Sequence, residues 1–214
     1  MTIKALVFDI GSVLEVIDDS VFPGPFELRH GLVPGATGAI PEFAGDPGIG
    51  ELTEAEVRAH IQLHLALGDE QADDYMRDFW NWYCGTLDQE LFDWFAAQHG
   101  RFKTGIVSNS GPGAREAERH YGFEQITDDI VYSHEVGVAK PDPEIYVLAA
   151  RRLAVEPHEI VFLDDSQKCV DGARAVGWHA VLHVDTATSI KELEAIIAVL
   201  DLPAASRRAC PPHP

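Results

Sequence analysis

Four groups of polar residues stand directly after short apolar runs, and their side chains are the ones in this chain that could do chemistry. They are Asp9, Ser108-Asn109, Lys140 and Asp164-Asp165. In open α/β sheets the carboxyl ends of parallel strands meet at one edge, and ligands bind there. Together these groups predict a phosphoryl-transfer site built around an aspartate nucleophile.

Asp9 is the candidate nucleophile. It ends the apolar run 3–8 and is followed by a turn at Gly11. A carboxylate in this place can accept a phosphoryl group as an aspartyl-phosphate and then release it to water. An aspartate that merely caps a turn is common, so the interpretation of Asp9 depends on the other three groups.

Ser108, Asn109 and Lys140 are the candidate ligands of the phosphoryl oxygens. Ser108-Asn109 offers a hydroxyl, an amide and backbone N–H donors after the run 104–107, and such donors suit the equatorial oxygens of a transferring phosphoryl group. Lys140 precedes Pro141 in a loop, where its ammonium group can neutralise both the phosphate and the nucleophile. Taken singly, these residues are more often an ordinary turn or a solvated lysine.

Asp164-Asp165 is the most specific of the four groups. Two adjacent carboxylates at the end of a buried run repel each other and lose hydration unless a cation lies beside them. Mg²⁺ prefers one or two carboxylates together with phosphate oxygens and water. A helix N-cap would explain one of the two acids but not easily both, so the pair predicts a Mg²⁺ site.

The elements that must position these groups alternate along the chain. Five short apolar runs are separated by helical patterns, and this alternation predicts an α/β fold with a parallel sheet covered on both faces. The expected strands are 3–8, 104–107, 130–132, 160–163 and 179–182, and the expected helices are 89–98, 113–120, 143–153, 167–176 and 190–200.

The stretch between the first two strands is far longer than the roughly 30 residues of a βαβ unit. It holds helical patterns at 53–66, which opens with the capping-box spacing of Thr53 and Glu56, and at 70–83. The Pro- and Gly-rich segment 22–50 is predicted to be a loop with little regular structure. The expected domains are a core of residues 1–15 and 88–202, a helical cap of residues 16–87 and a disordered tail of residues 203–214.

The second helical pattern of the cap carries a cluster of aromatic side chains, and two interpretations stay open. The cluster either forms the cap's own core, which we prefer, or lines a substrate cleft under the cap. Its members are Tyr75, Phe79, Trp80, Trp82 and Tyr83.

The four polar groups closely resemble the motifs of the haloacid dehalogenase-like (HAD) hydrolase superfamily, in the branch with a helical cap after the first motif. The resemblance covers nearly the whole chain and rests on Phe8-Asp9-Ile10-Gly11-Ser12-Val13-Leu14, Val107-Ser108-Asn109, Lys140-Pro141 and Leu163-Asp164-Asp165-Ser166. It implies a Rossmann-like sheet in the strand order 5-4-1-2-3. It also implies Mg²⁺ bound by Asp9, the backbone carbonyl of Gly11, Asp164 and Asp165, with Asp165 the more direct of the two adjacent acids.

Gly11 departs from the family pattern. Phosphatases and mutases of the family usually carry a second aspartate there as general acid and base, a role typically worth about 10²–10⁴-fold. Relatives that open on Phe-Asp-Leu-Gly, such as bacterial α-D-glucose-1-phosphate phosphatases, are nonetheless similar to this chain. We hypothesise that Glu15, Asp18 or a water molecule takes the missing role.

The composition bears on the partners. With 35 acidic and 16 basic residues the formal net charge is −19, which argues against nucleic acid or an anionic membrane as a partner. A phosphate site must then be locally positive, through a metal ion or a single lysine. No apolar stretch approaches the roughly 20 residues of a membrane helix, no signal peptide is evident, and the three cysteines form no CxxC pair. We expect a cytoplasmic monomer or homodimer.

The leading hypothesis is a Mg²⁺-dependent phosphatase of a small phosphorylated metabolite, with a sugar phosphate favoured. One alternative is a metal-free hydrolase that acts at carbon, as 2-haloacid dehalogenases of the superfamily do. Asp164-Asp165 argues against it, because two unneutralised acids would hinder attack by the nucleophile. A third class is a non-catalytic binding protein that has lost the usual acid at Gly11.

Overall fold

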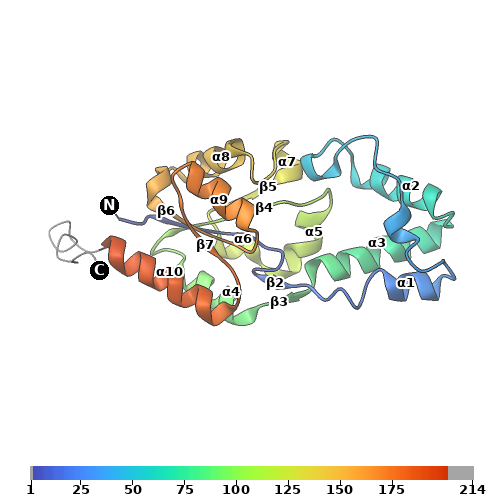
Figure 1. The fold of residues 1–214 in the computed structure, drawn as a ribbon, viewed down its shortest axis with the longest axis horizontal. Coiled ribbons are helices and arrows are strands. Elements are labelled where there is room, and N and C mark those ends of the chain that lie inside the picture. The colour runs from blue at the N-terminus through green and yellow to red at the C-terminus, as the bar shows by residue number, and fades with distance from the viewer. Residues whose placement is uncertain (1, 202–214) are drawn as a thin grey trace, which may run out of the picture.

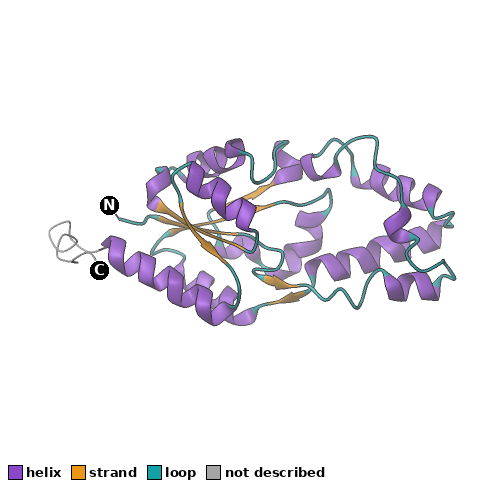
Figure 2. Cartoon of the chain, viewed as in Figure 1, coloured by secondary structure: helices purple, strands orange, loops and turns teal. Residues whose placement is uncertain are grey.

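Five parallel strands form the central sheet of the computed structural model, which describes residues 2–201 (Figures 1 and 2). The tail predicted at 203–214 lies outside these residues. The strands are β1 (Ala5–Phe8), β4 (Lys103–Ser108), β5 (Asp129–Tyr132), β6 (Ile160–Asp164) and β7 (His179–Leu182). They lie in the order β5-β4-β1-β6-β7. Numbered among themselves along the chain, they run 5-4-1-2-3 from the β7 edge, and the expected Rossmann-like fold is confirmed.

Successive side chains of each strand point to opposite faces of the sheet, so both faces have apolar side chains to bury. Helices cover both faces. Leu6 and Phe8 of β1 pack on one face with α4 (Gln89–Gln98) and α10 (Thr186–Asp201). Val7 packs on the other face with α8 (Pro143–Leu153) and α9 (Gln167–Ala175). Short helical segments complete the core: α5 (Ala114–Glu118), η3 (Arg119–Tyr121), α6 (Phe123–Ile126), α7 (Ser133–Val136) and η4 (Pro157–Glu159).

The last helix begins four residues earlier than the pattern at 190–200 predicts. Asp185 accepts hydrogen bonds from both the backbone N–H and the hydroxyl of Thr188, 2.8 Å each, at this end of the helix. These bonds satisfy backbone donors that a helix start leaves unpaired. The Asp-Thr-Ala-Thr sequence is therefore a helix start rather than a loop.

Residues 17–85, inserted between β1 and α4, pack around an apolar cluster of their own, which includes Phe22, Phe26, Ile61 and Tyr75. Its two long helices lie beside one another at the end of the molecule away from both the N-terminus and α10 (Figure 1). The expected capping box of Thr53 and Glu56 is present at the start of the first long helix. The segment comprises α1 (Gly24–Arg29), η1 (Thr37–Ala39), η2 (Pro47–Ile49), α2 (Glu54–His64) and α3 (Asp69–Cys84).

The prediction of little regular structure for 22–50 misses α1 and the two 3-10 turns. The prolines that suggested a loop stand where a helix tolerates them, since the first-turn N–H groups need no intrahelical partner. Pro25 lies in the first turn of α1 and Pro47 begins η2.

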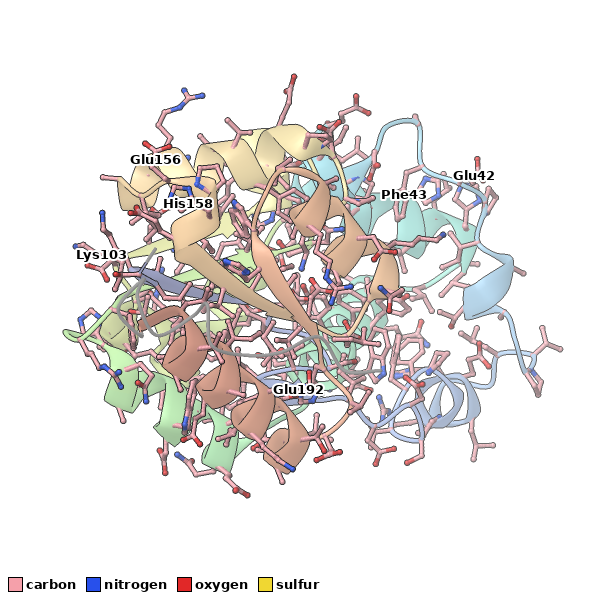
Figure 3. The ribbon with its side chains drawn as sticks, turned by 60° about the vertical axis from the view of Figure 1, so that its left-hand side comes forward. Glu42, Phe43, Lys103, Glu156, His158 and Glu192 are labelled. Carbon is pink, nitrogen blue, oxygen red and sulfur yellow. The ribbon has the colours of Figure 1, made fainter. Side chains whose placement is uncertain are left out.

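A two-stranded antiparallel ribbon marks both crossings between the core and the inserted segment. β2 (Glu15–Val16) leaves the core and β3 (Thr86–Leu87) returns to it. The inserted segment faces the carboxyl ends of the sheet strands. Lys103, Glu156 and His158 mark the opposite, amino-terminal ends, and lie far from Glu42 and Phe43 of the inserted segment (Figure 3).

The inserted segment contacts the core beside the strand ends. The Ser133 hydroxyl of α7 donates a 2.6 Å hydrogen bond to the Gly48 carbonyl of η2. Among residues 2–201, no helix is long and apolar enough to cross a membrane.

Candidate active site

The carboxyl edge of the sheet gathers the predicted site residues, because β4 and β6 flank β1. Phe8 pairs with Ile106 on one side and with Leu163 on the other. The Asp9 backbone N–H continues this ladder with a 2.9 Å bond to the Leu163 carbonyl. Asp9 therefore emerges between Ser108, which ends β4, and Asp164, which ends β6.

Lys140 lies at the centre of the site and bridges two carboxylates. Its Nζ is 2.8 Å from Asp9 Oδ1 and 2.7 Å from Asp164 Oδ2, and its side chain is 1% exposed. Burial alone would lower the pKa of Lys140. The negative charges of Asp9 and Asp164 outweigh the effect of burial, so the pKa is raised. The ammonium group is therefore a fixed positive charge beside the candidate nucleophile.

Asn109 fixes the loop that carries Lys140. Its amide donates to the Lys140 carbonyl at 2.8 Å and its side-chain oxygen accepts from the Lys140 N–H at 2.7 Å. Both functional groups of the side chain are thus engaged with the Lys140 backbone. Asn109 acts on the site through the position of Lys140, whereas the neighbouring Ser108 is buried at the end of β4.

The three acids predicted to bind metal converge at the same edge. Oxygen atoms of Asp9, Asp164 and Asp165 lie within 4.8 Å of one another, and no other such group of His, Cys, Asp or Glu occurs among the described residues. Three carboxylates facing one buried lysine leave an excess of negative charge. A hard divalent cation with oxygen ligands, such as Mg²⁺, fits this donor set.

Burial also shifts the pKa values of these acids. Burial raises the pKa of Asp9 to about 6, with Lys140 opposing the rise and the charge of Asp164 adding to it. Burial and the charge of Asp164 likewise raise the pKa of Asp165. A bound cation would favour the ionised form of each acid.

Gly11 lies in the turn after Asp9 with room for a side chain. A Cβ atom built on it would meet only Ile17 Cδ1, at the ordinary contact distance of 3.7 Å. The glycine is therefore not demanded by crowding around its Cα.

The two residues suggested as substitutes for the missing acid differ sharply. Glu15 is fully buried, and neither carboxyl oxygen has a hydrogen-bond partner. Burial raises its pKa to about 10, with the charges of Glu118 and Asp9 adding to the effect, so Glu15 keeps its proton at neutral pH. Hydrogen bonding to the side chain and then to the backbone N–H of Ser20 lowers the pKa of Asp18. Only Glu15 is a proton donor at neutral pH.

Glu118 is a buried acid near the site that the sequence reasoning missed. It accepts a 2.5 Å hydrogen bond from the Tyr132 hydroxyl, and burial raises its pKa to about 7. The helical pattern around it, Ala-Arg-Glu-Ala-Glu, looks like a solvated surface. The signal would have been the spacing from Ala114, which is fully buried four residues earlier on the same helix face.

A family model described as haloacid dehalogenase-like hydrolase matches residues 3–177. Phosphatase MT3486 of Mycobacterium tuberculosis is 28% identical over 155 residues, 69% of this chain and 70% of that protein. Fructose-1-phosphate phosphatase YqaB of Escherichia coli is 32% identical over 92 residues, 42% of this chain and 49% of that protein. The chain spans no more than 16% of the length of several longer curated relatives.

The fold is shared with a solved structure of the HAD family enzyme BT-2542 from Bacteroides thetaiotaomicron, in complex with magnesium and inorganic phosphate. The TM-score is 0.74 at 21% identity, over 85% of this chain and 94% of that chain. At this identity the likeness establishes the fold.

Proposed function

Because the chain belongs to the haloacid dehalogenase-like hydrolase family, we propose that it is a Mg²⁺-dependent phosphatase of a small phosphorylated metabolite, acting through an aspartyl-phosphate on Asp9. One observation carries the proposal: the buried Lys140 ammonium joins Asp9 and Asp164 at the sheet edge, beside Asp165. The phosphatases among the relatives support it. So does the magnesium and phosphate complex of the structural neighbour.

In this proposal Asp9, the Gly11 carbonyl, Asp164 and Asp165 hold the metal ion. When bound, Mg²⁺ offsets the charge of the phosphate and of the carboxylates around it. Asp165 is more exposed than Asp164, whose two oxygens already accept from Lys140 and from the Ser166 N–H. This difference supports Asp165 as the more direct ligand of the two.

The first step is attack by a carboxylate oxygen of Asp9 on phosphorus. The bond from phosphorus to the ester oxygen breaks, and that oxygen leaves with a proton from water or from Glu15. Lys140 and Ser108 hold the phosphoryl oxygens, while Asn109 keeps Lys140 in place.

The second step is attack by water on phosphorus of the aspartyl-phosphate. The bond from phosphorus to Asp9 breaks, inorganic phosphate leaves, and the proton of the attacking water passes to solvent or to the group that gave one in the first step. Lys140 favours the ionised form of Asp9 before and after the cycle.

We also propose the domain division expected from the sequence, with residues 1–15 and 88–202 as the catalytic core and 16–87 as the cap. The separate apolar cluster of the inserted segment and its place over the strand ends support this division. Such a cap excludes bulk water and selects the substrate.

The test is phosphate release from a panel of sugar, acyl and aryl phosphates, with Mg²⁺ and with chelator. We expect metal-dependent release that Asp9→Asn abolishes. Release that is unaffected by chelator would contradict the Mg²⁺ requirement, whereas no phosphate release from any substrate together with halide release from a 2-haloacid would favour the dehalogenase-type alternative. Phosphate binding without release would favour the non-catalytic alternative and point to the loss of the acid at Gly11.

A further inference from the structure

An apolar cavity of about 440 Å³ lies between the cap and the loop that follows β4. Its volume falls within the range of about 300–1,000 Å³ that is usual for small-molecule sites. Gly111 and Pro112 form its core side, and they come directly after the polar segment of Ser108, Asn109 and Ser110. The core side of the cavity is therefore formed by the same loop that begins with the proposed phosphate ligands.

The cap side of the cavity is made of apolar side chains. Val57 and Ile61 come from α2, and Phe79 and Trp80 come from α3. Phe43, labelled in Figure 3, comes from the segment between η1 and η2. Val57, Phe43, Phe79 and Trp80 are only partly buried although they belong to the apolar cluster of the cap. They thus present apolar surface to the cavity that the protein itself does not cover.

Trp80 is held in a fixed orientation at this wall. Its indole N–H donates a 2.8 Å hydrogen bond to Glu54 Oε1, and its ring packs edge-on against Tyr83, with ring centroids 5.3 Å apart. Tyr83 in turn reaches the Asn109 carbonyl at 3.5 Å. The indole N–H is therefore not available to a ligand in the cavity. Through Tyr83, this wall contacts the segment that bears Asn109.

The lining offers few partners to a polar ligand. Glu42 is the only charged residue that lines it, and its charge is negative. Thr37 and Tyr75 are the lining residues with a side-chain hydroxyl, and the Thr37 hydroxyl is buried with no hydrogen-bond partner in the protein. A sugar would lose water from several hydroxyls here without replacing those hydrogen bonds, and a second anionic group would meet Glu42 instead of a cation.

We propose that this cavity receives the organic group of the substrate, and that this group is an aromatic or branched aliphatic group with few polar atoms, not a sugar. The proposal rests on the phosphatase function proposed above and names its substrate class. Within the small phosphorylated metabolites proposed above, it replaces the sugar phosphates favoured from the sequence with phosphate monoesters of apolar alcohols.

The test uses primary alkyl phosphates, in which the reactivity of the leaving group is similar. We expect kcat/KM to increase from ethyl to 3-methylbutyl and 2-phenylethyl phosphate, because each buried methylene is worth a factor of about four. The value for 2-phenylethyl phosphate should exceed those for ethyl phosphate, glycerol phosphate and glucose 6-phosphate by about tenfold or more. Equal values, or a preference for the sugar phosphate, would overturn the proposal while leaving the phosphatase function in place.

Two matched variants on α2 locate the effect. Val57→Trp fills the cavity and should lower the ratio of kcat/KM for 2-phenylethyl over ethyl phosphate at least about tenfold. Leu63→Trp introduces the same side chain at a position that is 74% exposed and outside the cavity lining, and should keep the wild-type ratio. An unchanged ratio in Val57→Trp would contradict the proposed location.

If no phosphate is released from any substrate, dissociation constants measured by calorimetry still test the cavity proposal. The dissociation constant of 2-phenylethyl phosphate for Asp9→Asn should increase when Val57→Trp is added and not when Leu63→Trp is added. That result would support the cavity even though the phosphatase proposal had failed. Equal affinity for ethyl and 2-phenylethyl phosphate would overturn the cavity proposal.

Discussion

Gly11 is the residue at which this chain departs most clearly from its family. The position has space for a Cβ atom, since the nearest foreign atom is Ile17 Cδ1 at 3.7 Å. The absence of an acid there is therefore a chemical difference that the backbone does not enforce. Protonation of the leaving group is the step that it affects.

We predict that Gly11→Asp increases kcat for alkyl phosphates by about 10–10²-fold, because a general acid is worth most when the leaving group is poor. Turnover of 4-nitrophenyl phosphate, whose leaving group needs little protonation, should change much less. Steady-state rates on both substrates check this, with Gly11→Asn as the control that adds bulk without a proton. Equal effects of Asp and Asn would show that position 11 plays no acid–base role.

Glu118 gives the protein a pH-dependent stability. Below pH 4.5 the carboxyl is protonated in both the folded and the unfolded state. As pH rises to about 7, the unfolded chain loses this proton while the folded protein keeps it, so the free energy of unfolding falls. By linkage the total loss is roughly 3 kcal/mol, complete above pH 7.

We predict that Glu118→Gln makes the fall in the free energy of unfolding between pH 4.5 and 7 smaller by roughly 3 kcal/mol, since glutamine is neutral and still accepts the Tyr132 hydrogen bond, while the contribution of Glu15 remains. Urea unfolding across this range without metal ions measures it. Glu116→Gln is the matched control, because Glu116 lies on the same helix with its side chain 74% exposed. A wild-type pH profile in Glu118→Gln would contradict the assignment.

At the scale of elements, the contact between η2 and α7 holds the cap against the core. Gly50 ends η2 with a φ of 76°, and a Cβ atom there would lie 2.1 Å from the His134 carbonyl oxygen. Gly31 has a similar φ of 67° with nothing within 4 Å. Alanine substitutions at Gly31 and Gly50 can therefore be compared to separate the cost of backbone strain from the cost of losing the contact between η2 and α7.

We predict that Gly31→Ala lowers stability by about 1 kcal/mol through strain alone. Gly50→Ala should cost clearly more and raise KM, because η2 must move away from α7. Thermal unfolding and steady-state kinetics of the pair check this. Identical behaviour of the two variants would mean that the contact contributes nothing to cap placement.

The elements also show what the sequence could predict. The five apolar runs were sufficient to predict the sheet, and the residues that follow three of them, Asp9, Ser108 and Asp164, indicated the edge of the candidate site, because strand burial and strand ends leave a local pattern. Contacts between segments that are far apart in the sequence leave no such local pattern. The clamp of Asn109 on the Lys140 backbone, the burial of Glu118 and the wall contributed by Phe43 each depend on parts of the chain that meet only after folding.

At the scale of the whole molecule, the acidic chain must gather positive charge where a phosphate binds. Lys140 supplies one charge and a metal ion would supply two more, against a formal net charge of −19. Metal binding should therefore be coupled to the stability of the protein, because the unfolded chain has no such cluster of acids.

We predict that Mg²⁺ at a hundred times its dissociation constant stabilises the protein by about 2.7 kcal/mol, which raises Tm by roughly 5–10 °C for a chain of this size. Asp165→Asn should remove most of this shift. Asp171→Asn, which changes an exposed acid on α9, should retain it. A full shift in Asp165→Asn would remove Asp165 from the metal site.

The most direct test of the account is mass spectrometry of the protein after acid quenching during turnover with Mg²⁺ and 2-phenylethyl, aryl and sugar phosphates. We predict one added phosphoryl group on the peptide that contains Asp9, absent from Asp9→Asn and absent when the metal is chelated. Phosphate release by Asp9→Asn at the wild-type rate, or a phosphoryl group on another residue, would contradict the central claim that Asp9 is the nucleophile.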